Sequence, residues 1–102
     1  METYIGVVTH YYNHLGVAVL ALCDELKLNC VVHLLGSTND FCLEVRSLEI
    51  DHHKVDDGQP GQEVALKTVD TVRMGDRIFL APEAVPTELR EIIYQRMDAW
   101  EG

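Results

Sequence analysis

Histidine and cysteine are the residues of this chain whose side chains could bind a metal ion or act as catalysts. They are His10, His14, His33, His52 and His53, together with Cys23, Cys30 and Cys42. A zinc ligand lies within about 2.1 Å of the ion, but an extended segment would separate the Cα atoms of the first two histidines by about 13 Å. The adjacent pair would face opposite sides of a strand, and no cysteine pair has zinc-ligand spacing. We expect no metal and no other cofactor.

A cysteine nucleophile with a histidine base is the strongest enzymatic alternative. Such a pair needs a thiolate of low pKa and a base within hydrogen-bond reach. Cys42 has the parity opposite to Phe41 and Leu43, so it can face outward, and His33 on the preceding predicted strand can lie across from it. No serine stands in a G-x-S-x-G elbow, and the phosphate loop G-x-x-x-x-G-K-[ST] is absent. We therefore expect no catalytic residue and no enzyme activity, with this Cys/His pair as the alternative.

An aromatic segment and a loop that faces it are the best candidates for contact with a partner. The segment could be an exposed platform on which bases stack, although core packing of Tyr11 or Tyr12 is favoured. Loops on rigid scaffolds often carry function. The candidate partner-binding residues are His10, Tyr11, Tyr12, His14, Ser37, Thr38 and Asp40.

The composition predicts one globular, cytoplasmic domain. The chain has 102 residues, of which 47% are hydrophobic and 25% charged, which is enough apolar material for one core. It has no run of about 18 uncharged apolar residues that could cross a membrane. The first residues carry no Lys/Arg cluster, so we expect no signal peptide. The compartment is then reducing, and we expect three free thiols.

The charge argues against a direct nucleic-acid partner. Lysine and arginine number 8 and aspartate and glutamate 17, so the net charge is −9 with neutral histidine. Proteins that bind nucleic acid alone concentrate positive charge, because counterion release supplies much of the affinity. We expect no strong binding of naked RNA or DNA, and we interpret the acidity as an aid to solubility.

Short apolar segments separated by turns predict an all-β domain. In the fourth segment the apolar parity changes near Arg46 and Ser47, which predicts a bulge or corner there. Asn29 can adopt the positive φ that a tight turn may require. The predicted strands are 4–8, 16–22, 30–35, 41–50, 63–69 and 77–80.

A helix is predicted after Pro86. Thr87 can serve as its N-cap, and apolar residues follow at helical spacing: Leu89, Ile92, Ile93, Met97 and Trp100. A helix this short is only marginally stable by itself in water, so its apolar face must pack against another surface. We predict a β domain over residues 1–81 and a linker with an amphipathic helix over 82–102, packed on that domain. A groove on a partner is the alternative.

An ordered series of motifs resembles a known barrel. Its most specific blocks are Val8-Thr9-His10-Tyr11 and Thr38-Asn39-Asp40-Phe41, within a series that spans residues 4–12, 15–19, 26–28, 36–41, 45–52, 61–67 and 72–79. The series resembles the second-domain β-barrel of elongation factor Tu, and above all stand-alone translation elongation factor-like proteins. The same barrel is also the C-terminal domain of collagenase-like peptidases.

The resemblance implies a six-stranded closed β-barrel that docks rather than reacts. In the GTPases that barrel contacts the nucleotide domain, the ribosome or the aminoacyl end of tRNA. The family has Gly-Asp where this chain has Asn29-Cys30, so any role of that aspartate is lost. We predict a non-catalytic docking module for a protein or ribonucleoprotein partner. The oligomeric state is open, and a structural homo-oligomer with Met97 and Trp100 between subunits is a further alternative.

Overall fold

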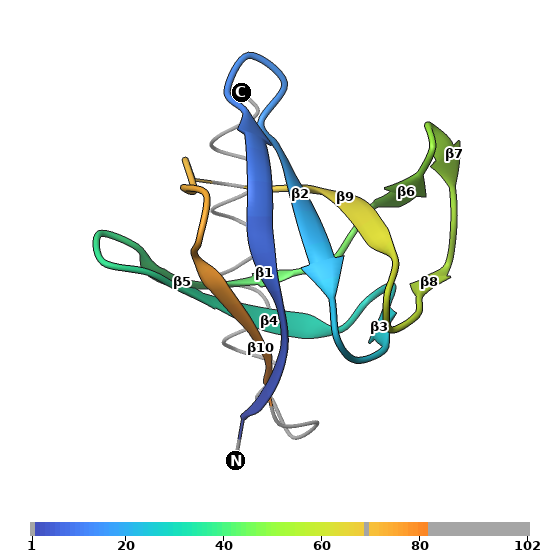
Figure 1. The fold of residues 1–102 in the computed structure, drawn as a ribbon, viewed down its shortest axis with the longest axis horizontal. Helices are drawn as coiled ribbons and strands as arrows, with labels where there is room; N and C mark the ends of the chain where they lie inside the picture. Colours follow the sequence, from blue (N-terminus) through green and yellow to red (C-terminus); the bar gives the residue numbers. More distant parts are fainter. Residues whose placement is uncertain (1, 69, 82–102) are drawn as a thin grey trace.

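The described part of the chain consists of β-strands and turns (Figure 1). The structure is a computed structural model that describes residues 2–68 and 70–81. Its strands are β1 (Thr3–Tyr12), β2 (Val17–Leu22), β3 (Leu26–Lys27), β4 (Val31–Leu35), β5 (Asp40–Glu44), β6 (Leu48–Ile50), β7 (His53–Lys54), β8 (Asp57–Gly58), β9 (Glu63–Lys67) and β10 (Arg77–Leu80). This confirms the predicted all-β class for these residues.

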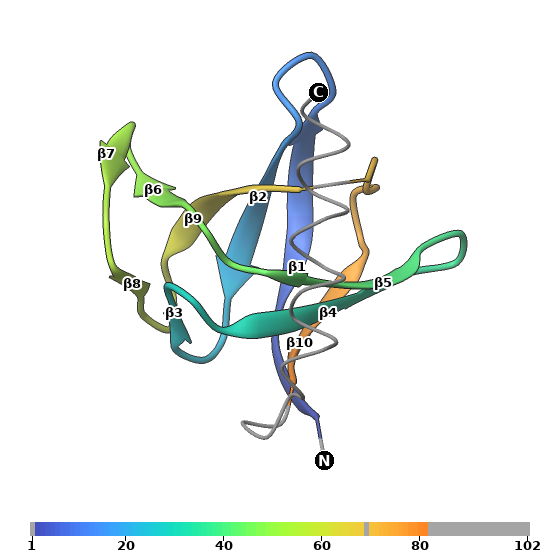
Figure 2. The same cartoon turned by 180° about the vertical axis from the view of Figure 1, so that it is seen from behind.

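Eight strands form one curved sheet in the order β5-β4-β10-β1-β2-β9-β6-β7, and β3 pairs with β8 separately. All pairs are antiparallel. The two views in Figures 1 and 2 show the sheet curling around its interior. The prediction of a closed six-stranded barrel is wrong for the described residues, because no pairing joins the two ends of the sheet order. At the two ends of the order, β7 pairs with β6 alone and β5 with β4 alone among the described strands.

The core lies inside the curl and follows from alternation along strands such as β2 and β9. In β2, Ala18, Leu20 and Leu22 are buried while the residues between them are half-buried. In β9, Val64 and Leu66 point to the same interior. Each fully buried leucine or valine contributes roughly 1.5–3 kcal/mol through removal of apolar surface from water. This apolar interior holds the loops at the sheet ends in place.

The predicted change of phase in the fourth segment is a corner, as expected. β5 ends at Glu44 and pairs with β4, while β6 begins at Leu48 and pairs with β9. Between them Val45 is buried, and its backbone accepts from Asn29 N–H at 2.7 Å and donates to Cys30 O at 2.8 Å. The corner lets the apolar residues on both sides of it point inward.

Positive φ angles occur at the tight turns. Asn29 has φ 72°, which confirms the prediction for that turn. Asp51 and His52 have φ 51° and 67°, and they form the two-residue turn between β6 and β7. Two consecutive positive φ angles are typical of a type I′ hairpin. The expectation that His52 and His53 lie on one strand is therefore wrong, since the first of them is in the turn.

The predicted helix and the 82–102 segment lie outside the described residues. Within residues 2–68 and 70–81, no helix is long and apolar enough to cross a membrane.

Candidate functional site

A β-bulge in β1 sets the directions of the aromatic segment. The pairing with β2 shifts between Val8 and His10, so Thr9 is an extra residue in β1. The shift reverses the alternation: Val8 is buried, Tyr11 packs against the core, and His10 and Tyr12 are exposed. The rings of His10 and Tyr12 lie 4.3 Å apart between centroids. Of the predicted residues in this strand, two are therefore available for contact and one belongs to the core.

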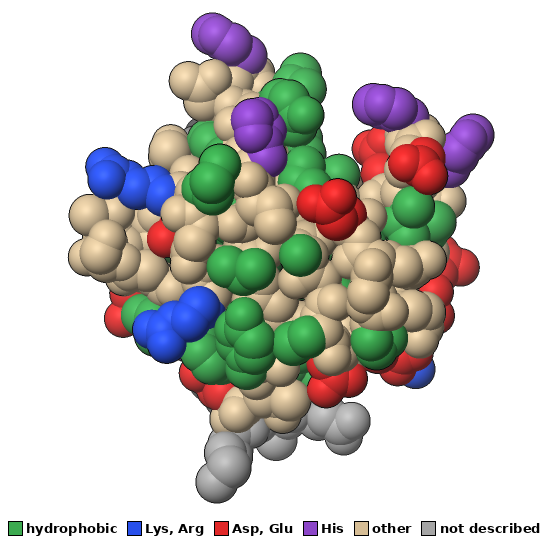
Figure 3. Space-filling view, viewed as in Figure 1, with side chains coloured by type: hydrophobic (Ala, Val, Ile, Leu, Met, Phe, Trp, Pro, Cys, Tyr) green, Lys and Arg blue, Asp and Glu red, His purple; other side chains and the backbone are tan. Residues whose placement is uncertain are grey.

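The turn between β1 and β2 presents apolar side chains to solvent. Tyr12 O accepts hydrogen bonds from the N–H groups of Leu15 and Gly16, at 3.1 and 2.9 Å, and Gly16 has φ 66°. Tyr12 is 49% exposed and Leu15 66% exposed, and His14 is exposed at the tip. Figure 3 shows hydrophobic and histidine side chains gathered at the tip of this hairpin.

The other predicted loop is the tight turn between β4 and β5. Gly36 N–H donates to Asn39 O at 2.8 Å, which closes the turn. Ser37 and Thr38 are exposed at its tip, and Asp40 is the first residue of β5.

Asp76 ties this turn to the one that precedes β10. The Asp76 side chain is almost fully buried, and its Oδ2 accepts hydrogen bonds from Asn39 Nδ2 at 2.8 Å and from Arg73 N–H at 3.0 Å. Its carboxylate lies directly against Gly36, where an added Cβ would be 1.9 Å from Asp76 Oδ1. Glycine at position 36 is therefore required for this close approach.

The turn over residues 73–76 is also fastened to β1. Val8 N–H donates to Asp76 O at 2.8 Å, and Gly75 N–H donates to Val8 O at 2.8 Å. Gly75 has φ 96°, which glycine adopts without strain. The 73–76 turn thus lies between the 36–39 turn and β1. The two loops predicted to contact a partner are at the same end of the sheet, but this third turn separates them.

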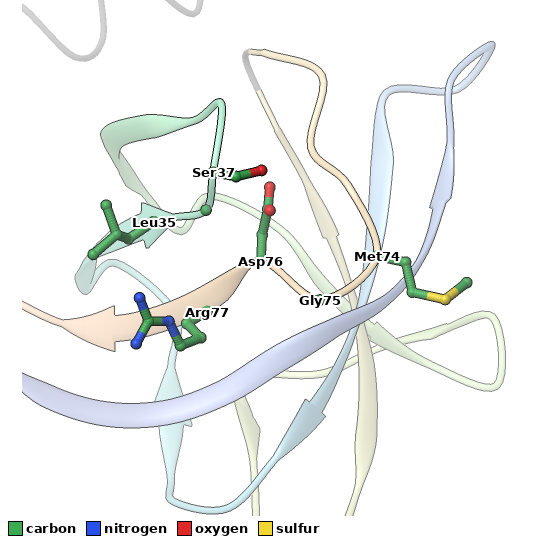
Figure 4. A pocket seen from close by; sticks show the side chains of 7 residues that line it. Leu35, Ser37, Met74, Gly75, Asp76 and Arg77 are labelled. Atoms are coloured by element: carbon green, nitrogen blue, oxygen red, sulfur yellow. The ribbon is translucent and has the colours of Figure 1, made fainter.

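A surface pocket of about 520 Å³ lies at this end. Its lining residues are Leu35, Gly36, Ser37, Met74, Gly75, Asp76 and Arg77. In Figure 4 the side chains of Ser37 and Asp76 point toward each other, and Arg77 projects on the side of Leu35. Met74, which is 71% exposed, points away from them across β1.

The pocket end differs in charge from the rest of the chain. Its three turns, residues 10–16, 36–39 and 73–77, contain two arginines and one aspartate, a net charge of +1, whereas the chain carries −9. The aspartate is Asp76, whose carboxylate is buried in the contacts given above. Among the ion pairs of the described residues, none involves Arg73 or Arg77. The Arg77 guanidinium lies 5.8 Å from the centroid of the Phe79 ring.

A row of side chains crosses the outer face from β1 to β5. Tyr4 pairs with Phe79, Phe79 with His33, and His33 with Cys42. His33 Nδ1 lies 2.9 Å from the Glu2 carboxylate, and its Nε2 is hydrogen-bonded to Asp40 Oδ1. Burial lowers the pKa of His33, but the hydrogen bonds to the two carboxylates and their negative charges outweigh it and raise the pKa.

This arrangement opposes the Cys/His alternative. The prediction that His33 lies across from Cys42 is confirmed by the β4–β5 pairing. However, both ring nitrogens of His33 face carboxylates, which favour the protonated ring over the neutral one that a base requires. Burial, and then the charges of Glu2 and Asp40, raise the pKa of the Cys42 thiol. A nucleophilic cysteine needs the opposite shift.

All three cysteines are free, with Cys23 exposed and the other two half-buried. In the part of the chain that the structure describes, no three His, Cys, Asp or Glu side chains are grouped so that they could hold a metal ion.

The residues that sequence reasoning missed are those of the turn before β10. These residues lie between the predicted strands 63–69 and 77–80, and neither the buried carboxylate of Asp76 nor the pocket beside Arg77 followed from the pattern. One signal was available: Asp76 follows Gly75 and directly precedes an apolar strand, where an aspartate can accept hydrogen bonds from turn amides.

Comparisons with known proteins link the chain to peptidases. No family model matches it. A stretch of 83 residues, 79% of the chain, is 34% identical to the uncharacterized protease MJ0090 of Methanocaldococcus jannaschii, and the match spans only 20% of that protein's length. The fold matches a crystal structure of the C-terminal domain of a protein described as a U32 peptidase of Geobacillus thermoleovorans, with a TM-score of 0.74 and 16% identity. The match covers 78% of this chain and 93% of that domain, and the domain's selenomethionine variant gives a TM-score of 0.70 and 17% identity.

These findings correct one expectation and support another in part. The expectation of no enzyme activity is contradicted, because the curated relative that the chain matches over 20% of its length is named a protease. Of the two barrels that the sequence resembles, the peptidase C-terminal domain is supported, and no comparison directly supports the second domain of elongation factor Tu. The described residues share the fold of a U32 peptidase C-terminal domain.

Proposed function

We propose that this chain is a protein-binding β module that serves a peptidase of the U32 type by holding polypeptide substrate. The observation that carries the proposal is the fold match, which covers 93% of the C-terminal domain of such a peptidase. The 34% identity to one part of a protease adds a sequence link. The chain would then contact the polypeptide substrate, and its partner would be a peptidase of the U32 class.

The shape of the pocket end supports a binding role. Three turns are held together by buried contacts, so they present a fixed surface. Tyr12, Leu15 and Met74 are the large hydrophobic side chains exposed there. Exposed aromatic and methionine side chains are enriched where proteins bind other proteins. We propose that the contact residues on the two loops are His10, Tyr12, His14, Ser37 and Thr38.

A protein partner is favoured over a ribonucleoprotein because of charge. The chain carries −9, and a polyanion would be repelled by most of its surface. Unfolded polypeptide has no such net charge requirement, and a peptidase must hold it in extended form before cleavage.

The test is binding of labelled gelatin fragments, an unfolded polypeptide, to the purified chain by fluorescence anisotropy. Tyr12→Ala should weaken binding by about tenfold, the loss expected when an aromatic anchor is truncated. His52→Ala is the matched control, because it removes an exposed ring from the β6–β7 turn, far along the sheet order. Absence of binding by the unmodified chain, or equal losses in both variants, would refute the proposal.

A further inference from the structure

The pocket end carries two arginines on a chain that is otherwise strongly acidic, and its one exposed carboxylate, Asp40, is hydrogen-bonded to His33. Arg73 begins the turn before β10, and Arg77 is the first residue of β10. Neither takes part in an ion pair among the described residues. Asp76 lies between them in sequence, but its carboxylate is buried and accepts two hydrogen bonds. Within residues 2–68 and 70–81, neither guanidinium is therefore neutralised by a carboxylate. Most of the basic side chains visible in Figure 3 are on its left side, and many of the acidic ones are on the lower and right-hand parts.

Among the described residues, the Arg77 side chain contacts an aromatic ring, and its guanidinium makes no hydrogen bond with them. Its guanidinium lies 5.8 Å from the centre of the Phe79 ring. Such a contact uses the face of a guanidinium and leaves the N–H groups at its edge for a planar acceptor. Phe79 is itself fixed by an edge contact with Tyr4, with ring centroids 5.7 Å apart. The donors of Arg77 are thus oriented beside the pocket before any ligand arrives.

Apolar surface lies next to these cations. Leu35 lines the pocket on the side of Arg77. Met74 is 71% exposed on the same turn as Arg73, and that turn is hydrogen-bonded to β1 at Val8, two residues before His10. A ligand that spans the end would meet the Arg77 guanidinium beside Leu35, and the Met74 side chain on the far side of the turn.

We propose that the pocket beside Arg77 and Met74 binds a short acidic segment of a protein, in which carboxylates alternate with apolar side chains. The segment's carboxylates pair with Arg77 and Arg73, and its apolar side chains pack on Met74 and Leu35. A long nucleic acid fits less well, because beyond this end it would meet the net negative charge of the chain. The inference rests on the proposed function and names the chemical class of the polypeptide that is held.

The experiment measures anisotropy of a labelled ten-residue peptide that alternates Glu or Asp with Leu or Tyr, mixed with the full chain at 0.05 and 0.15 M salt. A second peptide with Gln and Asn at the acidic positions and a ten-nucleotide RNA are compared. The acidic peptide should bind about tenfold more tightly than its amide counterpart, and Arg77→Gln should remove about that factor. Lys27→Gln is the matched control, since Lys27 is an exposed cation on β3. It should leave the affinity unchanged.

Three outcomes would overturn the inference: equal binding of the acidic and amide peptides, no effect of Arg77→Gln, or tighter binding of the RNA. A dimer that dissociates in Arg77→Gln, seen by sedimentation, would assign the pocket to a second copy and also overturn it. The unfolding midpoint of each variant shows that the fold is intact. If gelatin fragments bind while the acidic peptide has no advantage, only this inference fails; if neither binds, the proposed function fails as well.

Discussion

The contact between Gly36 and Asp76 gives a quantitative prediction for Gly36→Ala. The new Cβ would lie 1.9 Å from Oδ1 and 2.5 Å from Cγ of Asp76, so the carboxylate must move. Its movement breaks the hydrogen bonds from Asn39 Nδ2 and from Arg73 N–H. Hydrogen bonds to charged groups contribute roughly 1.5–3 kcal/mol each, and the displaced carboxylate recovers part of this by contact with water. We expect the free energy of unfolding to fall by about 2–4 kcal/mol.

A double-mutant cycle tests the cause of that loss. Asp76→Ala removes the atoms that the new Cβ would meet, so adding Gly36→Ala to it should change the free energy of unfolding by less than about 0.5 kcal/mol. Urea denaturation followed by far-ultraviolet circular dichroism measures each variant. Thr38→Ala, at an exposed position of the same turn and outside these hydrogen bonds, is the control and should cost about 0.5 kcal/mol or less. If the losses of the two single variants simply add, the reasoning about their contact is wrong.

Three further predictions concern the outer face and the core. Nuclear magnetic resonance titration of His33 should give a pKa above 6.5, because its carboxylate hydrogen bonds outweigh burial. Protonated His33 stabilises the fold below its unfolded pKa, and this stabilisation is lost as the pH rises through its folded pKa. The excess in free energy of unfolding over His33→Gln should therefore shrink above neutral pH. A growing excess would contradict this. Iodoacetamide at pH 8 should label Cys42 more slowly than the exposed Cys23, since burial and nearby carboxylates raise the Cys42 pKa, and faster labelling of Cys42 would show the thiol to be activated. Urea denaturation should show a larger loss of unfolding free energy for Gly6→Ala than for Gly58→Ala. A Cβ at Gly6 would lie 2.5 Å from a backbone oxygen of β2, whereas at Gly58 it would meet side-chain atoms at 2.7 Å, an overpacking that costs roughly 1–3 kcal/mol. An equal or smaller loss for Gly6→Ala would contradict this.

The longer strands of the described residues could be predicted from sequence because alternation and turn residues are local signals, whereas the two-residue strands β3, β7 and β8 were not predicted. The parity change near Arg46 and Ser47 correctly predicted a corner, since both halves must turn apolar side chains inward. Asn29 was expected at positive φ, and the turn has φ 72° there. These features depend on neighbouring residues only, so no tertiary information was needed.

The closure of the sheet depends on which strands pair, and that is not a local property. Ile50 was placed within a single long strand, whereas it precedes a two-residue turn formed by Asp51 and His52. Neither residue is a glycine, so the usual hairpin signal was missing. That turn ends the sheet with β7.

The candidate site was predictable only in part, because burial decides which polar residues are available. His10 and Tyr12 were identified, but the bulge at Thr9, which turns Tyr11 toward the core, has no sequence signature. Asp76 belongs to the site because distant Asn39 and Gly36 lie against it. Contacts across 37 residues of sequence cannot be inferred from spacing.

The pairing of Thr3 with Leu80 has a mechanical consequence. Tension applied at these two positions pulls along the hydrogen bonds of the antiparallel ladder, because those bonds run perpendicular to the strands. The bonds between β1 and β10 would then open one after another, from the outer pair toward Arg77, instead of resisting together. A force spectrometer attached at residues 3 and 80 should record rupture at lower force than one attached at residues 12 and 80, where the load runs along β1.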